Sequence, residues 1–269
     1  MGRVWAVAAA LIVGIAGCGP VDEGTAFADE FESVLDGREK VADYSVDGYN
    51  TLPWSGDADV RVTLVAGLAD EQIAREVWEI THQDVDPWVE YDLVVEFPAA
   101  SGDGQAATAA FRLGVSRPAP DTDEAREEVE RRAFVARSIV AQGRGETTMW
   151  IDTFSRQVTS ERDPAEFAAA LCAADLGEGY TDLTVSSSDE ARPSGRVEFA
   201  DADSCDDLAG PAALLDAARQ VGELADYSIS LPEGTREHPA VSVSFVTPPV
   251  STDALRDLAD SLDIDLTVA

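Results

Sequence analysis

Val41-Ala42-Asp43-Tyr44-Ser45-Val46 and Leu224-Ala225-Asp226-Tyr227-Ser228-Ile229 are two hexapeptides of this 269-residue chain that match position by position. Each is followed, at a similar distance, by a strand-like alternating run and a capped helical segment. A second match joins Asp92-Leu93-Val94-Val95, Asp182-Leu183-Thr184-Val185 and Asp265-Leu266-Thr267-Val268, which begin 90 and 83 residues apart. Because the order, the spacing and both matches agree, the sequence predicts an internal repeat.

Apolar residues between these matches follow two different periods, one typical of helices and one typical of strands. Helical spacing occurs at Phe27, Phe31 and Leu35, at Ile73, Val77 and Ile80, and again after the caps predicted at Asp121 and Asp163. Strict alternation marks strands that carry Val60, Val62 and Leu64; Tyr91, Leu93 and Val95; Phe111 and Leu113; Met149 and Ile151; Leu183 and Val185; Val197 and Phe199; and Val241, Val243 and Phe245.

These elements group into three repeats, 27–119, 120–202 and 203–269. Each is expected to run helix, strand or hairpin, helix, strand, strand, with the final strand missing from the third. Strands with one hydrophobic face and interleaved helices predict an α+β fold. We therefore expect tandem αβ repeats in which antiparallel-rich sheets are covered by helices on one face.

The order of elements resembles two known arrangements. Between Val60 and Phe154 the order strand, helix, strand, strand, helix, strand is similar to the ferredoxin-like split βαβ pattern. Taken from each leading helix, a unit is similar to the BON-type modules of bacterial envelope proteins. Both likenesses concern element order, and a likeness of fold does not carry function.

The amino terminus has the layout of a signal peptide, with Arg3 followed by an apolar run from Val4 to Ile15. Ile15-Ala16-Gly17-Cys18 resembles the lipobox of bacterial lipoproteins. That resemblance implies a signal peptide over 1–17, cleavage before Cys18 and a diacylglyceryl group on its thiol. Residues 18–26 would form a short tether, so we expect a lipid-anchored protein on the extracytoplasmic side of the cell membrane.

The chain is strongly acidic, with 52 acidic and 19 basic residues and a net charge of −33. Loss of Arg3 with the leader would make the mature charge −34. Such a charge disfavours nucleic acid and anionic lipid headgroups as partners. A solvated acidic surface is the expected consequence.

Cys172 and Cys205 remain as an even pair if Cys18 is lipidated. Because an extracytoplasmic compartment is oxidising, we expect them to form a disulfide. A redox or metal-binding pair is disfavoured, because the two cysteines do not have Cys-x-x-Cys spacing and no histidine is near either of them in the sequence.

No catalytic constellation stands out. Gly114-Val115-Ser116-Arg117-Pro118 lacks the second glycine of a nucleophile elbow, and the two histidines, His82 and His238, are expected to be exposed turn residues. The densest acidic group is Asp201, Asp203, Asp206 and Asp207, which begins like a calcium loop. However, it has Asp206 and Ala212 where glycine and an acid belong. We interpret these acids as helix-capping residues, with weak calcium binding left open.

The segment from Tyr49 to Trp54 is expected to form a loop between strands, and its two aromatic residues make it a candidate binding loop. Packing of this loop on its own core is the alternative.

The sequence thus favours a non-enzymatic lipoprotein that contacts an envelope protein or the cell wall, and no cofactor is expected. Two alternatives are an extracytoplasmic hydrolase that uses scattered carboxylates and a calcium-dependent binding module.

Overall fold

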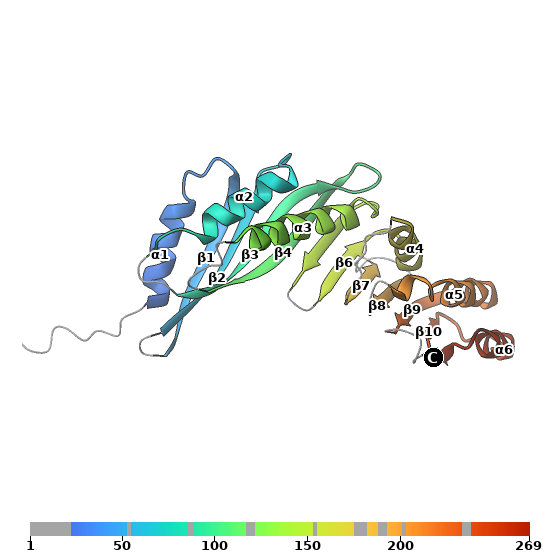
Figure 1. Ribbon diagram of the computed structural model, residues 1–269. Coiled ribbons are helices and arrows are strands. Elements are labelled where there is room, and N and C mark those ends of the chain that lie inside the picture. Colours follow the sequence, from blue (N-terminus) through green and yellow to red (C-terminus); the bar gives the residue numbers. More distant parts are fainter. Residues whose placement is uncertain are drawn as a thin grey trace, which may run out of the picture.

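The computed structural model describes residues 23–52, 55–85, 89–116, 122–152, 155–174, 182–187, 193–200, 203–232 and 238–269. Within these ranges the chain forms six α-helices and one mixed sheet of eleven strands (Figure 1). The α+β prediction is therefore confirmed. The expectation of antiparallel-rich sheets is wrong, because the strands form one sheet in which five parallel pairings alternate with five antiparallel ones.

The helices are α1 (Glu23–Leu35), α2 (Asp70–Thr81), α3 (Asp123–Val140), α4 (Pro164–Ala174), α5 (Ala209–Val221) and α6 (Asp253–Leu262). The strands are β1 (Val41–Leu52), β2 (Ser55–Leu64), β3 (Glu90–Ala100), β4 (Ala106–Val115), β5 (Thr147–Ile151), β6 (Arg156–Ser160), β7 (Leu183–Ser187), β8 (Ser194–Phe199), β9 (Leu224–Leu231), β10 (Ala240–Phe245) and β11 (Asp265–Val268). A 3₁₀ turn, η2 (Asp203–Cys205), precedes α5.

Strands lie in the sheet in the same order as in the sequence, from β1 to β11. β1 and β2 form an antiparallel hairpin, α2 then crosses over, and β3 pairs parallel with β2. The same αββ step recurs along the chain, so the repeating unit is one helix followed by one hairpin. Each segment predicted as a repeat contains two such steps, except the last, which ends with the single strand β11.

The strand order also corrects one expectation. A split βαβ arrangement would place a third strand between the two strands that a helix connects, but β2 and β3 are direct parallel neighbours. The ferredoxin-like interpretation is therefore wrong. Element order could not reveal this, because the two arrangements differ only in which strands pair.

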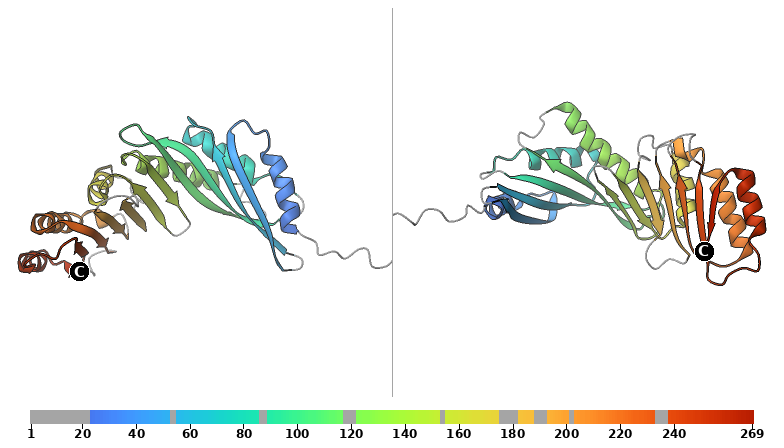
Figure 2. Two further views of the ribbon diagram at one scale, coloured as in Figure 1. Left: turned by 180° about the vertical axis from the view of Figure 1, so that it is seen from behind. Right: turned by 90° about the horizontal axis from the view of Figure 1, so that it is seen from below.

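All six helices cover the same face of the sheet, which is long and curved (Figures 1 and 2). Inward positions are apolar and buried, as the alternation in β3, β9 and β10 shows. The helices contribute Phe27, Phe31, Ile73, Ile139, Phe167 and Leu214, all fully buried. The core is thus a single layer between helices and sheet.

The first helix lies unusually close to the sheet. A Cβ atom built on Gly24 would come within 2.5 Å of the Tyr49 carbonyl oxygen, and one on Gly48 within 2.0 Å of the Gly24 carbonyl oxygen. Because glycine has no side chain, the α1 backbone can lie directly on β1. Asn50 completes this contact, since its Oδ1 accepts a 3.1 Å hydrogen bond from the Gly24 amide.

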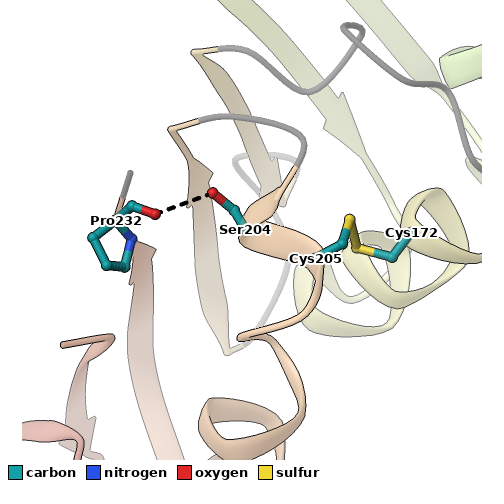
Figure 3. Close-up of a disulfide and its surroundings, with 4 residues drawn as sticks. All are labelled: Cys172, Ser204, Cys205 and Pro232. Carbon is teal, nitrogen blue, oxygen red and sulfur yellow. Dashed lines mark hydrogen bonds between the residues drawn. A yellow bond between two sulfur atoms is a disulfide. The ribbon is translucent and has the colours of Figure 1, made fainter. Parts of the chain in front are cut away.

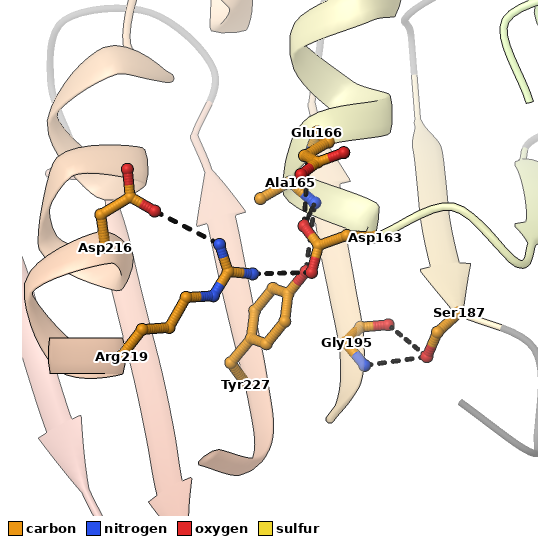
Figure 4. Close-up of polar contacts among 8 residues, drawn as sticks. All are labelled: Asp163, Ala165, Glu166, Ser187, Gly195, Asp216, Arg219 and Tyr227. Carbon is orange, nitrogen blue, oxygen red and sulfur yellow. Dashed lines mark hydrogen bonds and ion pairs between the residues drawn. The ribbon is translucent and has the colours of Figure 1, made fainter. Parts of the chain in front are cut away.

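Tyrosines on the first strand of a unit pack against the helix of the unit before it. Tyr91 of β3 lies 5.4 Å from Phe27 and 5.2 Å from Phe31 of α1, measured between ring centroids. Tyr227 of β9 reaches the start of α4, where its hydroxyl accepts a 3.1 Å hydrogen bond from the Ala165 amide (Figure 4). This second contact uses the tyrosine of the repeated hexapeptide.

Cys172 and Cys205 form a disulfide with a Cα separation of 5.5 Å (Figure 3). The bond joins α4 to the turn η2, and beside it Ser204 donates a hydrogen bond to the Pro232 carbonyl. The predicted pairing is confirmed, and it ties α4 to the turn that precedes α5.

Candidate interaction surface

The helices leave the opposite face of the sheet uncovered, and we refer to it as the open face. Its residues are defined by strand register, because side chains alternate between the two faces. One row runs across every strand: Asp43, Thr63, Glu96, Ala110, Trp150, Gln157, Thr184, Glu198, Ser230, Ala240 and Asp265. With neighbouring strands about 4.8 Å apart, this row is roughly 48 Å long.

The neighbouring row is rich in hydroxyl groups and is called the hydroxyl row. Its members from β4 to β11 are Thr108, Thr148, Thr159, Ser186, Arg196, Ser228, Ser242 and Thr267. The Oγ atoms of Thr159 and Ser186 lie 3.3 Å apart. Short polar side chains keep this part of the face flat and wettable.

Trp150 lies near the middle of the open face, between Ala110 and Gln157 on the adjacent strands. It is partly exposed, whereas the flanking Met149 and Ile151 are buried beneath the helices. The exposed part of the indole is accessible as a contact surface. Tryptophan is among the residues most enriched in interaction hot spots.

The amino-terminal end of the open face is acidic. Asp59 lies opposite Asp47 on one side and Asp92 on the other, and Asp57 lies between Tyr49 and Glu90. Directly opposed like charges destabilise a sheet by about 0.2–1 kcal/mol per pair. The field of Asp59, with smaller contributions from burial, Asp57 and Asp92, raises the pKa of Tyr49.

Arg112 lies within this acidic end and contacts several of its carboxylates. Its Nη2 lies 2.5 Å from the Asp92 carboxylate and 4.0 Å from that of Asp59, while its Nη1 lies 3.8 Å from Asp152. The hydrogen bond from Arg112 to Asp92 raises the pKa of the guanidinium. A single arginine thus holds three carboxylates across three strands and the end of a fourth.

The residues predicted as sites fall in different places. Cys18, Trp54 and Asp201 lie outside the described residues. Tyr49 lies within β1, not in a loop, and its side chain is 46% exposed on the open face. The candidate loop is thus corrected at Tyr49, where pairing with Asp57 extends the hairpin further than the sequence indicated.

Of the four acids near Cys205 that were weak calcium candidates, three lie in the described part of the chain. Asp203 begins η2, and Asp206 and Asp207 follow it with exposed side chains. No group of three or more histidine, cysteine or acidic residues with metal-binding geometry occurs among the described residues.

Of the two histidines, one is not the exposed turn residue that we expected. His82 stacks on Trp78 with ring centroids 3.8 Å apart and is half-buried at the end of α2. His238 is exposed and lies 3.0 Å from Asp263.

Comparison of the chain with family models, curated proteins and solved structures finds no match. Within the described residues, none of the helices combines the length and apolar character that crossing a membrane requires. The interpretation of this protein therefore depends on its own residues and geometry.

Sequence reasoning missed Trp150 and the hydroxyl row. A signal for Trp150 was present, since an aromatic residue between Met149 and Ile151 is out of phase with the buried positions of a strand. The hydroxyl row has no such signal. Apart from Arg196, its members are single serines and threonines that only strand pairing brings into line.

Proposed function

We propose that this protein is a membrane-anchored, extracytoplasmic lipoprotein that acts as a non-enzymatic interaction module of the cell envelope. Cys18 would carry the lipid, and the open face would contact an envelope protein or the cell wall. In element order the αββ units are like BON-type envelope modules, which is consistent with this role.

The observation that carries the proposal is the one-sided cover of the sheet. An eleven-strand sheet with helices on one face presents a broad, shape-persistent surface. On this surface the partly exposed Trp150 lies between Ala110 and Gln157, with Thr148 and Asp152 two residues away along the chain. Residues on strands are held more rigidly than residues on loops, which favours binding by reducing the entropy lost on association.

The two alternatives have less support among the described residues. A hydrolase that uses carboxylates needs two acids that converge on a cleft. The acids of the open face instead lie on a surface, and Arg112 is paired with Asp92 among them. A calcium module needs several oxygen ligands around one point, and no such group occurs in the described ranges.

Binding to envelope material tests the proposal. The purified folded domain is incubated with isolated cell walls and, separately, with detergent-solubilised envelope proteins. We expect saturable binding to one of these fractions, weakened at least about tenfold by Trp150→Ser, because hot-spot aromatic residues contribute 2 kcal/mol or more.

Phe134→Ser is the matched control, because Phe134 is also exposed, at 54%, but lies on α3 on the helix side of the molecule. Equal binding by wild type and Trp150→Ser, or turnover of wall or phosphoester substrates by the wild type, would contradict the proposal.

The lipid anchor makes a separate prediction. Cys18→Ala should release a folded, disulfide-bonded protein from the membrane fraction, since the anchor would be lost while the residues that form the sheet are unchanged. Cell fractionation with detection of the protein measures this. Retention of the Cys18→Ala variant in the membrane fraction would refute lipid anchoring, and Cys172→Ala serves as the control that should stay anchored.

A further inference from the structure

Three arginines converge on one small pocket, although the chain has only 19 basic residues against 52 acidic ones. The pocket has a volume of about 150 Å³ and lies where the middle of α3 meets the end of β5 and the start of β6. Arg131 and Arg132 line it from α3, and Arg156 lines it from the first residue of β6. We call it the arginine pocket.

Two carboxylates complete the charged lining. Glu128 accepts hydrogen bonds from Arg131 at 2.5 Å and 3.0 Å and from Arg132 at 2.7 Å. Asp152 lines the pocket beside the end of β5 and faces Arg112 at 3.8 Å. Among the described lining residues the three guanidinium groups therefore outnumber the carboxylates.

The crowding of like charges is strongest at Arg156. Burial, and then repulsion from Arg131 and Arg132, lowers the pKa of the Arg156 guanidinium. An anion bound among the three guanidinium groups would offset the repulsion between them. The arrangement is rigid because Arg132 also donates a 2.7 Å hydrogen bond to the Arg112 carbonyl on β4.

The size of the pocket limits the ligand. At about 150 Å³, the pocket is smaller than the roughly 300–1,000 Å³ of typical small-molecule sites. That space fits a single carboxylate or phosphoryl group, and arginine forks match the geometry of both groups.

We propose that the arginine pocket binds a small oxyanion, either a carboxylate or a phosphoryl group. This inference does not rest on the proposed function, because it concerns the helix side of the β5–β6 hairpin and not the open face. It identifies a local exception to the expectation that so acidic a chain repels anions.

Thermal unfolding of the purified full-length protein tests the inference. The probes are sodium phosphate and sodium acetate, each compared with sodium chloride at the same ionic strength and at pH 7. We expect at least one oxyanion to raise the unfolding midpoint above its value in chloride. A rise with phosphate alone identifies a phosphoryl site, and a rise with acetate alone identifies a carboxylate site.

Two variants locate the effect. Arg156→Gln and Arg131→Gln should each weaken the apparent Kd for the active oxyanion about tenfold, because each removes charge-assisted hydrogen bonds to it. Arg131 is 44% exposed on the helix surface, so its variant is expected to fold even if Arg156→Gln does not. Arg196→Gln is the control, since Arg196 lies on the open face and pairs with Glu198 at 2.7 Å.

The proposal is overturned if neither oxyanion raises the midpoint above that in chloride. It is equally overturned if the folded Arg131→Gln variant responds as strongly as the wild type and the Arg196→Gln control do, because the effect would then arise elsewhere on the surface.

Discussion

At the scale of single residues, the most deeply buried charge in the described chain is the Glu76 side chain, which is 4% exposed. Arg38 reaches its Oε1 at 2.7 Å, and Lys40, the only lysine of the protein, reaches its Oε2 at 3.2 Å. These pairs connect α2 to the turn that leads from α1 into β1. Removing one partner of a buried ion pair leaves the others uncompensated, which is costly.

Glu76→Ala should therefore lower the free energy of unfolding by about 3 kcal/mol, as measured by urea denaturation. Glu79→Ala is the matched control, because Glu79 approaches the same arginine at 3.5 Å but is 49% exposed. An exposed pair contributes at most about 1 kcal/mol. Similar losses in the two variants would show that burial of Glu76 is not the cause.

Buried tyrosines make stability sensitive to alkaline pH. Burial raises the pKa of Tyr91, and burial together with the charge of Asp163 raises the pKa of Tyr227. Their folded-state pKa values thus lie above the unfolded value of about 10. The protonated tyrosines therefore contribute stability to the folded state, and this contribution is fully present below pH 10. It is lost as the pH rises from there towards the folded-state values.

The midpoint of thermal unfolding, measured between pH 9 and pH 11.5, should therefore fall less steeply with rising pH for Tyr91→Phe and Tyr227→Phe than for the wild type. Tyr49→Phe should change the slope less, because Tyr49 is exposed. Parallel slopes in all four proteins would contradict this assignment.

At the scale of elements, the sequence predicts many helices and strands correctly. Burial of one face imposes a regular spacing on the apolar residues of each element. Val60, Val62 and Leu64 alternate into β2, and Ile73, Val77 and Ile80 form the buried side of α2. Asp163 caps α4, as its spacing to Glu166 predicted, through hydrogen bonds from the Ala165 and Glu166 amides.

Other elements could not be predicted because their signal is weak locally. The cap of α3 is the Thr122 side chain, which accepts from the Ala125 amide, and not Asp121, which lies outside the described residues. Tyr49 lies in a strand although Asp47, Gly48 and Asn50 around it are poor strand formers. Pairing with β2 overrides their preference, and only the folded chain contains that information.

The disulfide acts between elements. Replacing Cys172 and Cys205 with serine should lower the free energy of unfolding by about 3.5 kcal/mol, because the bond closes a loop of 33 residues in the unfolded chain. Denaturation with and without reductant measures this. Reductant should not change the free energy of unfolding of the double variant. If reductant also leaves that of the wild type unchanged, the bond does not stabilise the protein.

At the scale of the whole molecule, the repeated αββ step explains why one face stays open. Every crossover places its helix on the same side of the sheet, so adding units widens the open face without covering it (Figure 2). The result is a sheet whose chemistry changes along its length, from the carboxylates around Arg112 to the hydroxyl row. Different ends of the face can therefore favour different contacts.

We propose that this open face is the surface that meets a partner. Incorporation of the photo-cross-linking residue p-benzoylphenylalanine at position 150, and separately at position 134, tests it most directly in intact cells. We expect light-dependent cross-links from position 150 to an envelope component and none from position 134. Cross-links from position 134 alone, or from neither position, would contradict it.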